Sequence, residues 1–341
     1  MTAVPRNRRE PTESVRELDW LMLVVMALCC LGLVMAVSVL GSQSDAGPLA
    51  VMKKQGVKLL FGLVAFVVCA MTPVRLLRRA AMPLFFAAVF ACLLPHVLGG
   101  DTKGASRWIK LGGQQFQPVE PARFFLVLAV SWLLARAGAG LSSFRRGFLP
   151  AMGCTMLLAC AGLALLTFFA TQHDYVRGRI HDMFETRPDS QVGLGLIAVG
   201  SGGVFGRGLG QGWMKMNYVP EAHNDFVFAI IAEEFGYLGS LFVLGSYTTF
   251  GYLCYRLVAQ VRDPFLRYVV CGYALMICMQ AAVNLLVVSG WAPAKGIDLP
   301  FVSTGGTSLV FCLAAVGLIG NAVRSDRTGA FSTSEEAAVV S

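Results

Sequence analysis

Acidic residues stand at two depths in the stretch VPEAHNDFVFAIIAEEFG, which runs from Val219 to Gly236. Asp225 comes directly before a long apolar run, and Glu233 and Glu234 lie inside that run. A carboxylate before a helix can act as a general base, or it can cap the helix by accepting hydrogen bonds from backbone N–H groups. The two interior glutamates are costly among apolar residues, so they either line a polar cavity or form internal ion pairs.

Two further patterns suggest polar chemistry. Glu120 and Arg123 are three residues apart, a spacing that lets them pair on one face of a helix. The stretch GSGGVFGRGLGQG, residues 200–212, is followed by Lys215 and contains Arg207; its backbone could approach a phosphate closely. The same glycines also fit a flexible re-entrant or surface turn. A dinucleotide site is excluded, because no alternation of strands and helices surrounds the motif.

The elements that carry these residues are apolar. The chain has 341 residues, of which 56% are hydrophobic and only 14% are charged, and its mean hydropathy is +0.64. This composition predicts an all-α, polytopic integral membrane bundle with about eight transmembrane helices. The predicted spans are Trp20–Leu40, Val57–Thr72, Ala81–Leu98, Val119–Ala135, Phe148–Thr171, Phe226–Tyr255, Leu266–Val288 and Gly306–Val323.

Basic residues predict the orientation. Arginine pairs or triplets occupy every short loop on one side, which places both termini in the cytoplasm. The predicted transmembrane domain covers residues 20–324, between cytoplasmic tails at 1–19 and 325–341. Its outer loops are 99–118, 172–224 and 289–305. All seven lysines fall on the outer face, which indicates either an anionic ligand there or attraction to anionic headgroups.

The cysteines and histidines do not suggest a metal site. The ten cysteines all fall in predicted helices and form no C-x-x-C pair, so we interpret them as small packing residues. The four histidines lack the spacing of metal ligands.

Several motifs together resemble the SEDS family (FtsW/RodA/SpoVE) of bacterial cell-wall polymerases. The motifs are GASRWIKLG, QPVEPAR, YVRGRIHDMF, AVGSGGVFGRGLGQG, PEAHNDFVFAIIAEEFG and LPFVSTGGTSL, in the family's order. The resemblance covers roughly residues 20–323. GRGLGQGWMKMNYVPEAH and APAKG are more similar to the division branch of the family than to the rod-elongation branch. The family has ten spans, and this chain lacks two of them, together with the family's Q-P-D-x-G-T-A element.

The resemblance implies a peptidoglycan glycosyltransferase that polymerises lipid II on the outer face of the bacterial inner membrane, at the division septum. It implies Asp225 as the catalytic base. The matching substrate-binding residues are Lys54, Arg107, Trp108, Glu120, Arg123, Lys215, Glu221, His223, Lys295, Ser303 and Gly305. Its expected partners are a class B penicillin-binding protein transpeptidase, divisome proteins and membrane lipids, but no nucleic acid. No cofactor is required with certainty, although a divalent cation (Mg or Mn) is compatible with the site.

Three other functions fit the same sequence. A lipid II flippase would need a polar cavity but no single essential carboxylate. A division scaffold without catalysis would follow if the missing spans remove the activity. A rod-elongation polymerase would differ only in its partners.

Overall fold

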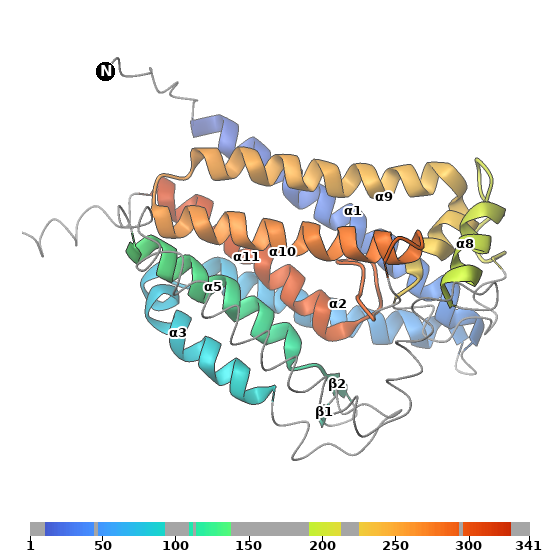
Figure 1. Cartoon of the computed structure of the whole chain (residues 1–341), viewed down its shortest axis with the longest axis horizontal. Coiled ribbons are helices and arrows are strands. Elements are labelled where there is room, and N and C mark those ends of the chain that lie inside the picture. The colour runs from blue at the N-terminus through green and yellow to red at the C-terminus, as the bar shows by residue number, and fades with distance from the viewer. Residues whose placement is uncertain are drawn as a thin grey trace, which may run out of the picture.

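Long helices account for nearly all of the described chain (Figure 1). A computed structural model describes residues 11–43, 47–92, 109–111, 114–137, 191–212, 225–292 and 296–328. The helices are α1 Pro11–Gln43, α2 Gly47–Met71, α3 Val74–Ala91, α5 Val119–Ala137, α8 Gln191–Ser201, α9 Val227–Gln260, α10 Pro264–Val288 and α11 Gly306–Arg327.

One small element departs from the expected all-α fold. Strands β1, Ile109–Leu111, and β2, Gln114–Phe116, form an antiparallel hairpin directly before α5. The hairpin lies in the loop that was expected at residues 99–118. Elsewhere in the described residues every regular element is a helix.

Five of the described helices are long and apolar enough to cross a membrane. These segments are Val15–Gly41, Gly47–Met71, Val227–Gln260, Pro264–Val288 and Gly306–Arg327. The predicted spans at α3 and α5 are helical too, but each of these helices carries three charged residues within 18 or 19 positions. The span expected at Phe148–Thr171 lies outside the described residues.

The predicted boundaries of two helices were wrong. α2 begins ten residues before Val57 and therefore contains Lys53, Lys54 and Lys58. α3 begins at Val74, so the arginines expected in a cytoplasmic loop lie on its first two turns. The cause is the same in both cases. A search for apolar runs stops at charged residues, whereas lysine and arginine are good helix formers.

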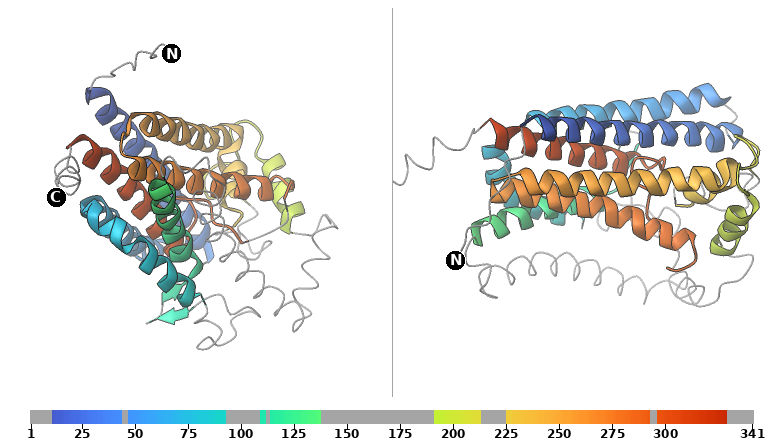
Figure 2. Two further views of the ribbon diagram at one scale, coloured as in Figure 1. Left: turned by 60° about the vertical axis from the view of Figure 1, so that its left-hand side comes forward. Right: turned by 90° about the horizontal axis from the view of Figure 1, so that it is seen from above.

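α11 is the central helix of the bundle. It runs between the α1–α2 pair and the α9–α10 pair (Figure 2). Within its most apolar segment 83% of the residues are buried, against 11% for α2. The close packing of α11 on α2 depends on Gly317, because a Cβ there would lie 2.4 Å from the carbonyl oxygen of Phe66. Tyr273 links α10 to α5, because its hydroxyl donates to the carbonyl of Phe124 at 3.1 Å.

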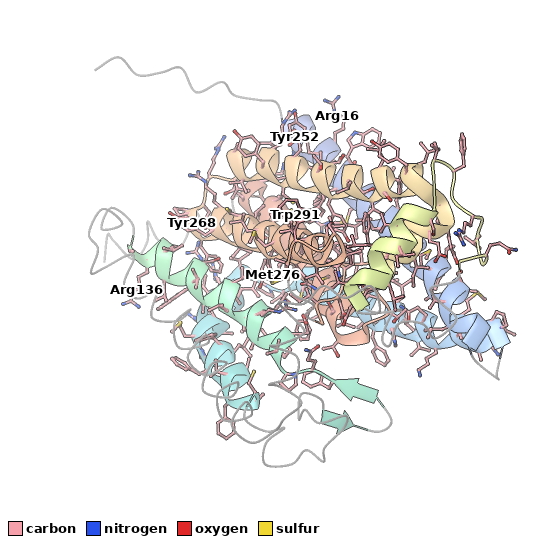
Figure 3. All side chains as sticks on the ribbon, turned by 45° about the vertical axis from the view of Figure 1, so that its right-hand side comes forward. Arg16, Arg136, Tyr252, Tyr268, Met276 and Trp291 are labelled. Atoms are coloured by element: carbon pink, nitrogen blue, oxygen red, sulfur yellow. The ribbon has the colours of Figure 1, made fainter. Side chains whose placement is uncertain are left out.

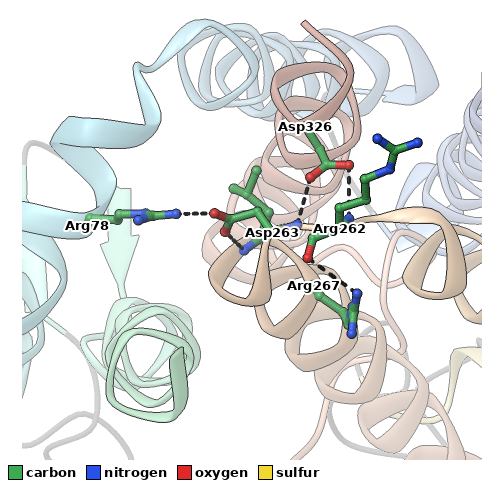
Figure 4. Close-up of polar contacts among 6 residues, drawn as sticks. Arg78, Arg262, Asp263, Arg267 and Asp326 are labelled. Atoms are coloured by element: carbon green, nitrogen blue, oxygen red, sulfur yellow. Dashed lines mark hydrogen bonds and ion pairs between the residues drawn. The ribbon is translucent and has the colours of Figure 1, made fainter. Parts of the chain in front are cut away.

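Arginines gather at one end of the bundle, as the predicted orientation requires. Asp263 joins α3 to α10 there: it pairs with Arg78 of α3 at 2.5 Å and caps α10 by accepting from the N–H of Leu266 at 3.0 Å (Figure 4). Asp326 of α11 accepts from the N–H groups of Arg262 and Asp263 at 3.0 and 2.8 Å. The turn between α9 and α10 is thereby fixed to both α3 and α11.

The outer surface of the bundle carries many exposed apolar side chains. Tyr252 of α9 is 55% exposed and stands out from the bundle, whereas the exposed Arg136 marks the end of α5 (Figure 3). Most of the outward face of α2 is likewise apolar and exposed. An apolar circumference with charged ends is what a lipid bilayer requires of a membrane-spanning bundle.

Candidate functional site

Asp225 lies at the mouth of the bundle, two residues before the first residue of α9. The N-cap position is occupied by Phe226, and no side chain caps the helix there. The interpretation of Asp225 as the capping residue is therefore wrong by one position. Its carboxylate faces the segment that precedes α11, since a Cβ on Gly296 would lie 3.1 Å from Asp225 Oδ2.

The segment from Gly296 to Gly305 forms the other wall of the site. Its turn is held by Ser303, whose Oγ accepts from the N–H of Leu299 at 2.8 Å. Phe301 adopts a φ of 66°, which is unusual for a residue with a side chain. Tyr247 of α9 donates to the carbonyl of Pro300. Ser303 was expected to bind substrate; the structure buries it and uses its hydroxyl to shape the loop.

Two cations approach this wall from neighbouring helices. Lys58 of α2 donates from Nζ to the carbonyl of Thr304 at 2.7 Å. Arg123 of α5 pairs with the buried Glu120, as their spacing predicted. Asp298 lies within electrostatic reach of both cations, and its Oδ2 would be 2.0 Å from a Cβ on Gly305. A glycine at 305 thus makes room for the carboxylate.

Arg123 retains a hydrogen-bonding group without a partner. Its Nε is buried and makes no hydrogen bond, although its Nη2 reaches Glu120. A buried donor of this kind is costly unless a ligand or a water molecule completes it. Arg123 therefore keeps one donor that a water molecule or an anionic ligand could complete.

α9 is broken at Gly236, and the glycine-rich stretch fills the break. Gly236 has φ 67° and ψ −155°, which are not helical values. The freed carbonyls of Glu233 and Glu234 accept from the N–H groups of Arg207 and Gly208 at 2.9 and 3.1 Å. In return, the N–H groups of Tyr237 and Leu238 donate to the carbonyls of Gly203 and Val204 at 2.9 and 3.3 Å.

This pairing explains the glycines without a phosphate. A Cβ on Gly202 would lie 1.9 Å from the carbonyl oxygen of Ala232, and one on Gly206 would lie 2.1 Å from that of Glu234. The amides of residues 207 and 208 are already used within the chain, so they are not available to cradle a phosphate as the motif suggested. Unpaired backbone groups are not tolerated inside a membrane, and this contact satisfies them.

The two interior glutamates point to different partners, as their adjacent positions predicted. Glu234 meets Ser38 of α1, whose Oγ lies 2.8 and 2.9 Å from its two carboxylate oxygens. Glu233 faces the glycine-rich stretch, with Oε1 4.0 Å from Arg207 Nη1. Both side chains are at most 2% exposed. They stabilise the broken region of α9 behind Asp225.

The other predicted site residues divide into two groups. Lys54 is exposed, one helical turn before Lys58 on α2. Six of the predicted residues lie outside the described part of the chain: Arg107, Trp108, Lys215, Glu221, His223 and Lys295. Among the described residues, no group of three or more His, Cys, Asp or Glu side chains is placed to hold a metal ion.

Sequence reasoning missed four residues of the site. Lys58 lies within electrostatic reach of Asp298, whereas Gln280 and Asn284 of α10 donate to the backbone carbonyls of Asp298 and Asp225. The signals were present in the sequence. Lys58 follows Lys54 at helical spacing, and Gln280 and Asn284 are polar residues four apart in an otherwise apolar run.

Known proteins resemble the chain over most of its length. The FtsW/RodA/SpoVE profile, described as cell cycle protein, matches residues 19–171 and 155–328. A Geobacter sulfurreducens protein named "Probable peptidoglycan glycosyltransferase FtsW" is 32% identical over 348 residues, which cover 88% of this chain and 93% of the relative.

Two solved structures share the fold. One is described as "Structural coordination of polymerization and crosslinking by a peptidoglycan synthase complex"; it is 28% identical, has a TM-score of 0.65, and the match covers 90% of this chain and 97% of that one. The other is the rod shape determining protein RodA of Thermus thermophilus, at 27% identity and a TM-score of 0.61, covering 90% and 96%.

The two family matches overlap at residues 155–171, within the span predicted at Phe148–Thr171. The alignment to the Geobacter sulfurreducens relative runs over 348 positions yet includes only 88% of the 341 residues, so the relative contains positions without a counterpart here. These matches show that the chain belongs to the FtsW/RodA/SpoVE family of cell cycle proteins.

Proposed function

We propose that this chain is a peptidoglycan glycosyltransferase that polymerises lipid II on the outer face of the cytoplasmic membrane. The observation that carries the proposal is the position of the Asp225 carboxylate. It lies at the mouth of a membrane bundle, against the loop of residues 296–305, in which Lys58 contacts the carbonyl of Thr304 and Asp298 lies within electrostatic reach of Arg123. The names of the aligned relatives give the same class of enzyme, a peptidoglycan glycosyltransferase.

The chemistry follows from the charges. Asp225 accepts the proton of the acceptor sugar's 4-hydroxyl while that oxygen attacks the anomeric carbon of the donor. The bond from this carbon to the pyrophosphate breaks, and the pyrophosphate leaves as a stable anion with its lipid. Such a leaving group needs cations more than it needs a general acid. This explains one carboxylate base with basic neighbours, in contrast to the paired carboxylates of glycosidases.

We assign the cationic and polar neighbours of Asp225 to substrate binding. Lys58 and Arg123 supply positive charge from α2 and α5, and Glu120 holds Arg123. The remaining residues of the proposed binding set are Lys54, Arg107, Trp108, Lys215, Glu221, His223, Lys295, Ser303 and Gly305. Ser303 and Gly305 also shape the loop, because the Ser303 hydroxyl accepts from the N–H of Leu299 and Gly305 makes room for the Asp298 carboxylate.

The decisive experiment is Asp225→Asn, assayed by glycan-strand formation from labelled lipid II. The amide occupies the same volume but cannot accept the hydroxyl proton at neutral pH, so the rate should fall roughly 10²- to 10⁴-fold. Folding and membrane insertion should be unchanged. Polymerisation by Asp225→Asn at the wild-type rate would refute the role of Asp225. An inactive wild-type chain, with its partner present, would favour a scaffold instead.

We propose further that the chain has eight spans with both termini in the cytoplasm, on either side of the transmembrane domain at 20–324. Trp291, just after α10, is 84% exposed and lies at the proposed outer end. Thr328 follows α11 at the opposite end. A membrane-impermeant thiol reagent should label Trp291→Cys in intact cells, and should label Thr328→Cys only after permeabilisation. The reverse pattern would overturn the orientation.

We propose further that the chain belongs to the division branch of the family and acts with a transpeptidase partner. We expect the chain to act at the septum with a class B penicillin-binding protein, since glycan strands must be cross-linked as they form. The two enzymes should co-purify in mild detergent, and the partner should raise the polymerisation rate. Rescue of an elongation defect rather than a division defect would assign the chain to the rod-elongation branch.

A further inference from the structure

Asn284 of α10 connects the two walls of the site. Its side chain is 1% exposed, and its Nδ2 donates to the carbonyl of Asp225 at 2.8 Å and to the carbonyl of Ile297 at 2.7 Å. The amide nitrogen has two hydrogens, and these two bonds use both. Because both partners are acceptors, only the nitrogen end of the amide can face them. The direction of this side chain is therefore fixed by its surroundings.

Gln280 continues the same contact one helical turn earlier. Its Nε2 donates to the carbonyl of Asp298 at 2.9 Å and lies 3.3 Å from Ser308 Oγ. Residues four apart share one face of a helix. One face of α10 therefore donates to the backbone carbonyl of Asp225, the proposed base, and to those of Ile297 and Asp298 in the loop opposite.

The side-chain oxygen of Asn284, Oδ1, is evidence against a simple packing role. Its Oδ1 is buried and has no hydrogen-bond partner. A buried unpaired acceptor is costly, and an apolar residue of similar shape would avoid this cost. The amide is thus explained by its two donor bonds rather than by its volume.

We infer that Asn284 is a positioning residue for Asp225. It fixes the backbone of Asp225 to the loop of residues 296–305, so that the carboxylate keeps its place against Gly296. The inference rests on the proposed function for its catalytic consequence. The mechanical part, the coupling of the two segments, does not depend on any reaction.

The test uses Asn284→Leu, which keeps the approximate volume and removes both donors. The chain offers a matched control in Asn321 of α11. Asn321 is also buried, and its Nδ2 donates to the carbonyls of Cys69 and Thr72 at 2.8 and 2.7 Å. Cys69 and Thr72 lie at the C-terminal end of α2, away from Lys58 and the site. Asn321→Leu therefore removes the same kind of contact without touching Asp225.

Two measurements are made on both variants in the full chain with its partner. In polymerisation from labelled lipid II, Asn284→Leu should lower kcat about 10- to 100-fold with KM nearly unchanged, since small misplacements of a reacting group cost rates of this order. Asn321→Leu should keep kcat near that of the wild type. In amide hydrogen exchange, residues 226–229 and 297–303 should both exchange faster in Asn284→Leu only.

Each possible result decides the inference. Unchanged exchange in both segments overturns the coupling, and unchanged kcat with faster exchange overturns the catalytic consequence. If the wild type does not polymerise lipid II, the proposed function fails together with that consequence, while the coupling is still decided by exchange. Asn284→Ala serves if the leucine variant does not fold. Failure of both to fold, beside stable Asn321 variants, overturns the positioning role in favour of a structural one.

Discussion

Gly206 and Gly236 pack backbone against backbone at the point where α9 is broken. A Cβ on Gly236 would lie 2.3 Å from the amide nitrogen of Gly206, and both residues have a positive φ. Neither position tolerates a side chain, because the two segments exchange backbone hydrogen bonds across this contact. The break separates the short first part of α9, which follows Asp225, from the long second part that crosses the bundle.

Replacing either glycine should destabilise the protein. Gly236→Ala adds a Cβ where φ is 67° and ψ is −155°, a conformation essentially restricted to glycine, so strain alone should cost roughly 1–3 kcal/mol. Gly245→Ala is the matched control, because it lies in the same helix with nothing within 4 Å of the added Cβ. Thermal unfolding in detergent should show a lower Tm for Gly236→Ala only. Equal Tm values for the two variants would contradict the contact.

The break itself was not predictable from the apolar pattern. Hydropathy predicted one continuous span from Phe226 to Tyr255, because apolar residues dominate the sequence on both sides of Gly236. What distinguishes them is a tertiary contact with the glycine-rich stretch at residues 200–212. A sequence shows glycines but not which backbone they meet, so the stretch fitted a phosphate loop as well as a turn.

The contact between Glu234 and Ser38 supports the same region from α1. Ser38→Ala removes the hydroxyl that lies 2.8 and 2.9 Å from the buried carboxylate, which should destabilise the protein by roughly 1–3 kcal/mol. Ser246→Ala is the control, since its exposed hydroxyl only reaches the carbonyl of Phe242 in its own helix. Comparable melting temperatures for both alanine variants would show that Ser38 does not stabilise Glu234.

Much of the site could be predicted from motifs and helical spacing, and the rest required the fold. Glu120 and Arg123 pair as their spacing predicted, and the divergence of Glu233 from Glu234 follows from helix geometry. Lys58 was passed over because its importance depends on the distant carbonyl of Thr304. Contacts between residues more than 200 positions apart leave no signal in the local sequence.

Lys58 should be important for activity. Lys58→Met keeps the length of the side chain but removes the charge and the hydrogen bond to Thr304. Losing a cation that stabilises the leaving pyrophosphate should cost the transition state about 1.5–3 kcal/mol, which corresponds to a loss of roughly 10- to 100-fold in kcat/KM for lipid II polymerisation. The control is Lys53→Met, an exposed lysine on the same helix. Equal losses in both variants would indicate a general effect of surface charge.

Asp263 should make two separable contributions at the arginine-rich end. Its carboxylate pairs with Arg78 at 2.5 Å and also caps α10 through the N–H of Leu266. Asparagine caps helices about as well as aspartate but carries no charge, so Asp263→Asn should lose only the ion pair. Asp263→Ala should lose both, and the difference between the two variants should be about 1 kcal/mol in unfolding free energy.

Salt separates the two contributions of Asp263 further. Arg78 and Asp263 are 26% and 19% exposed, so added salt should weaken their ion pair partly. The capping hydrogen bond is short-ranged and should respond little. Raising ionic strength should therefore narrow the difference in Tm between wild type and Asp263→Asn, while the difference between Asp263→Asn and Asp263→Ala persists. If Asp263→Asn and Asp263→Ala are equally stable at every salt concentration, the side chain acts through its charge alone, and the start of α10 is held by the bonds that Asp326 makes to residues 262 and 263.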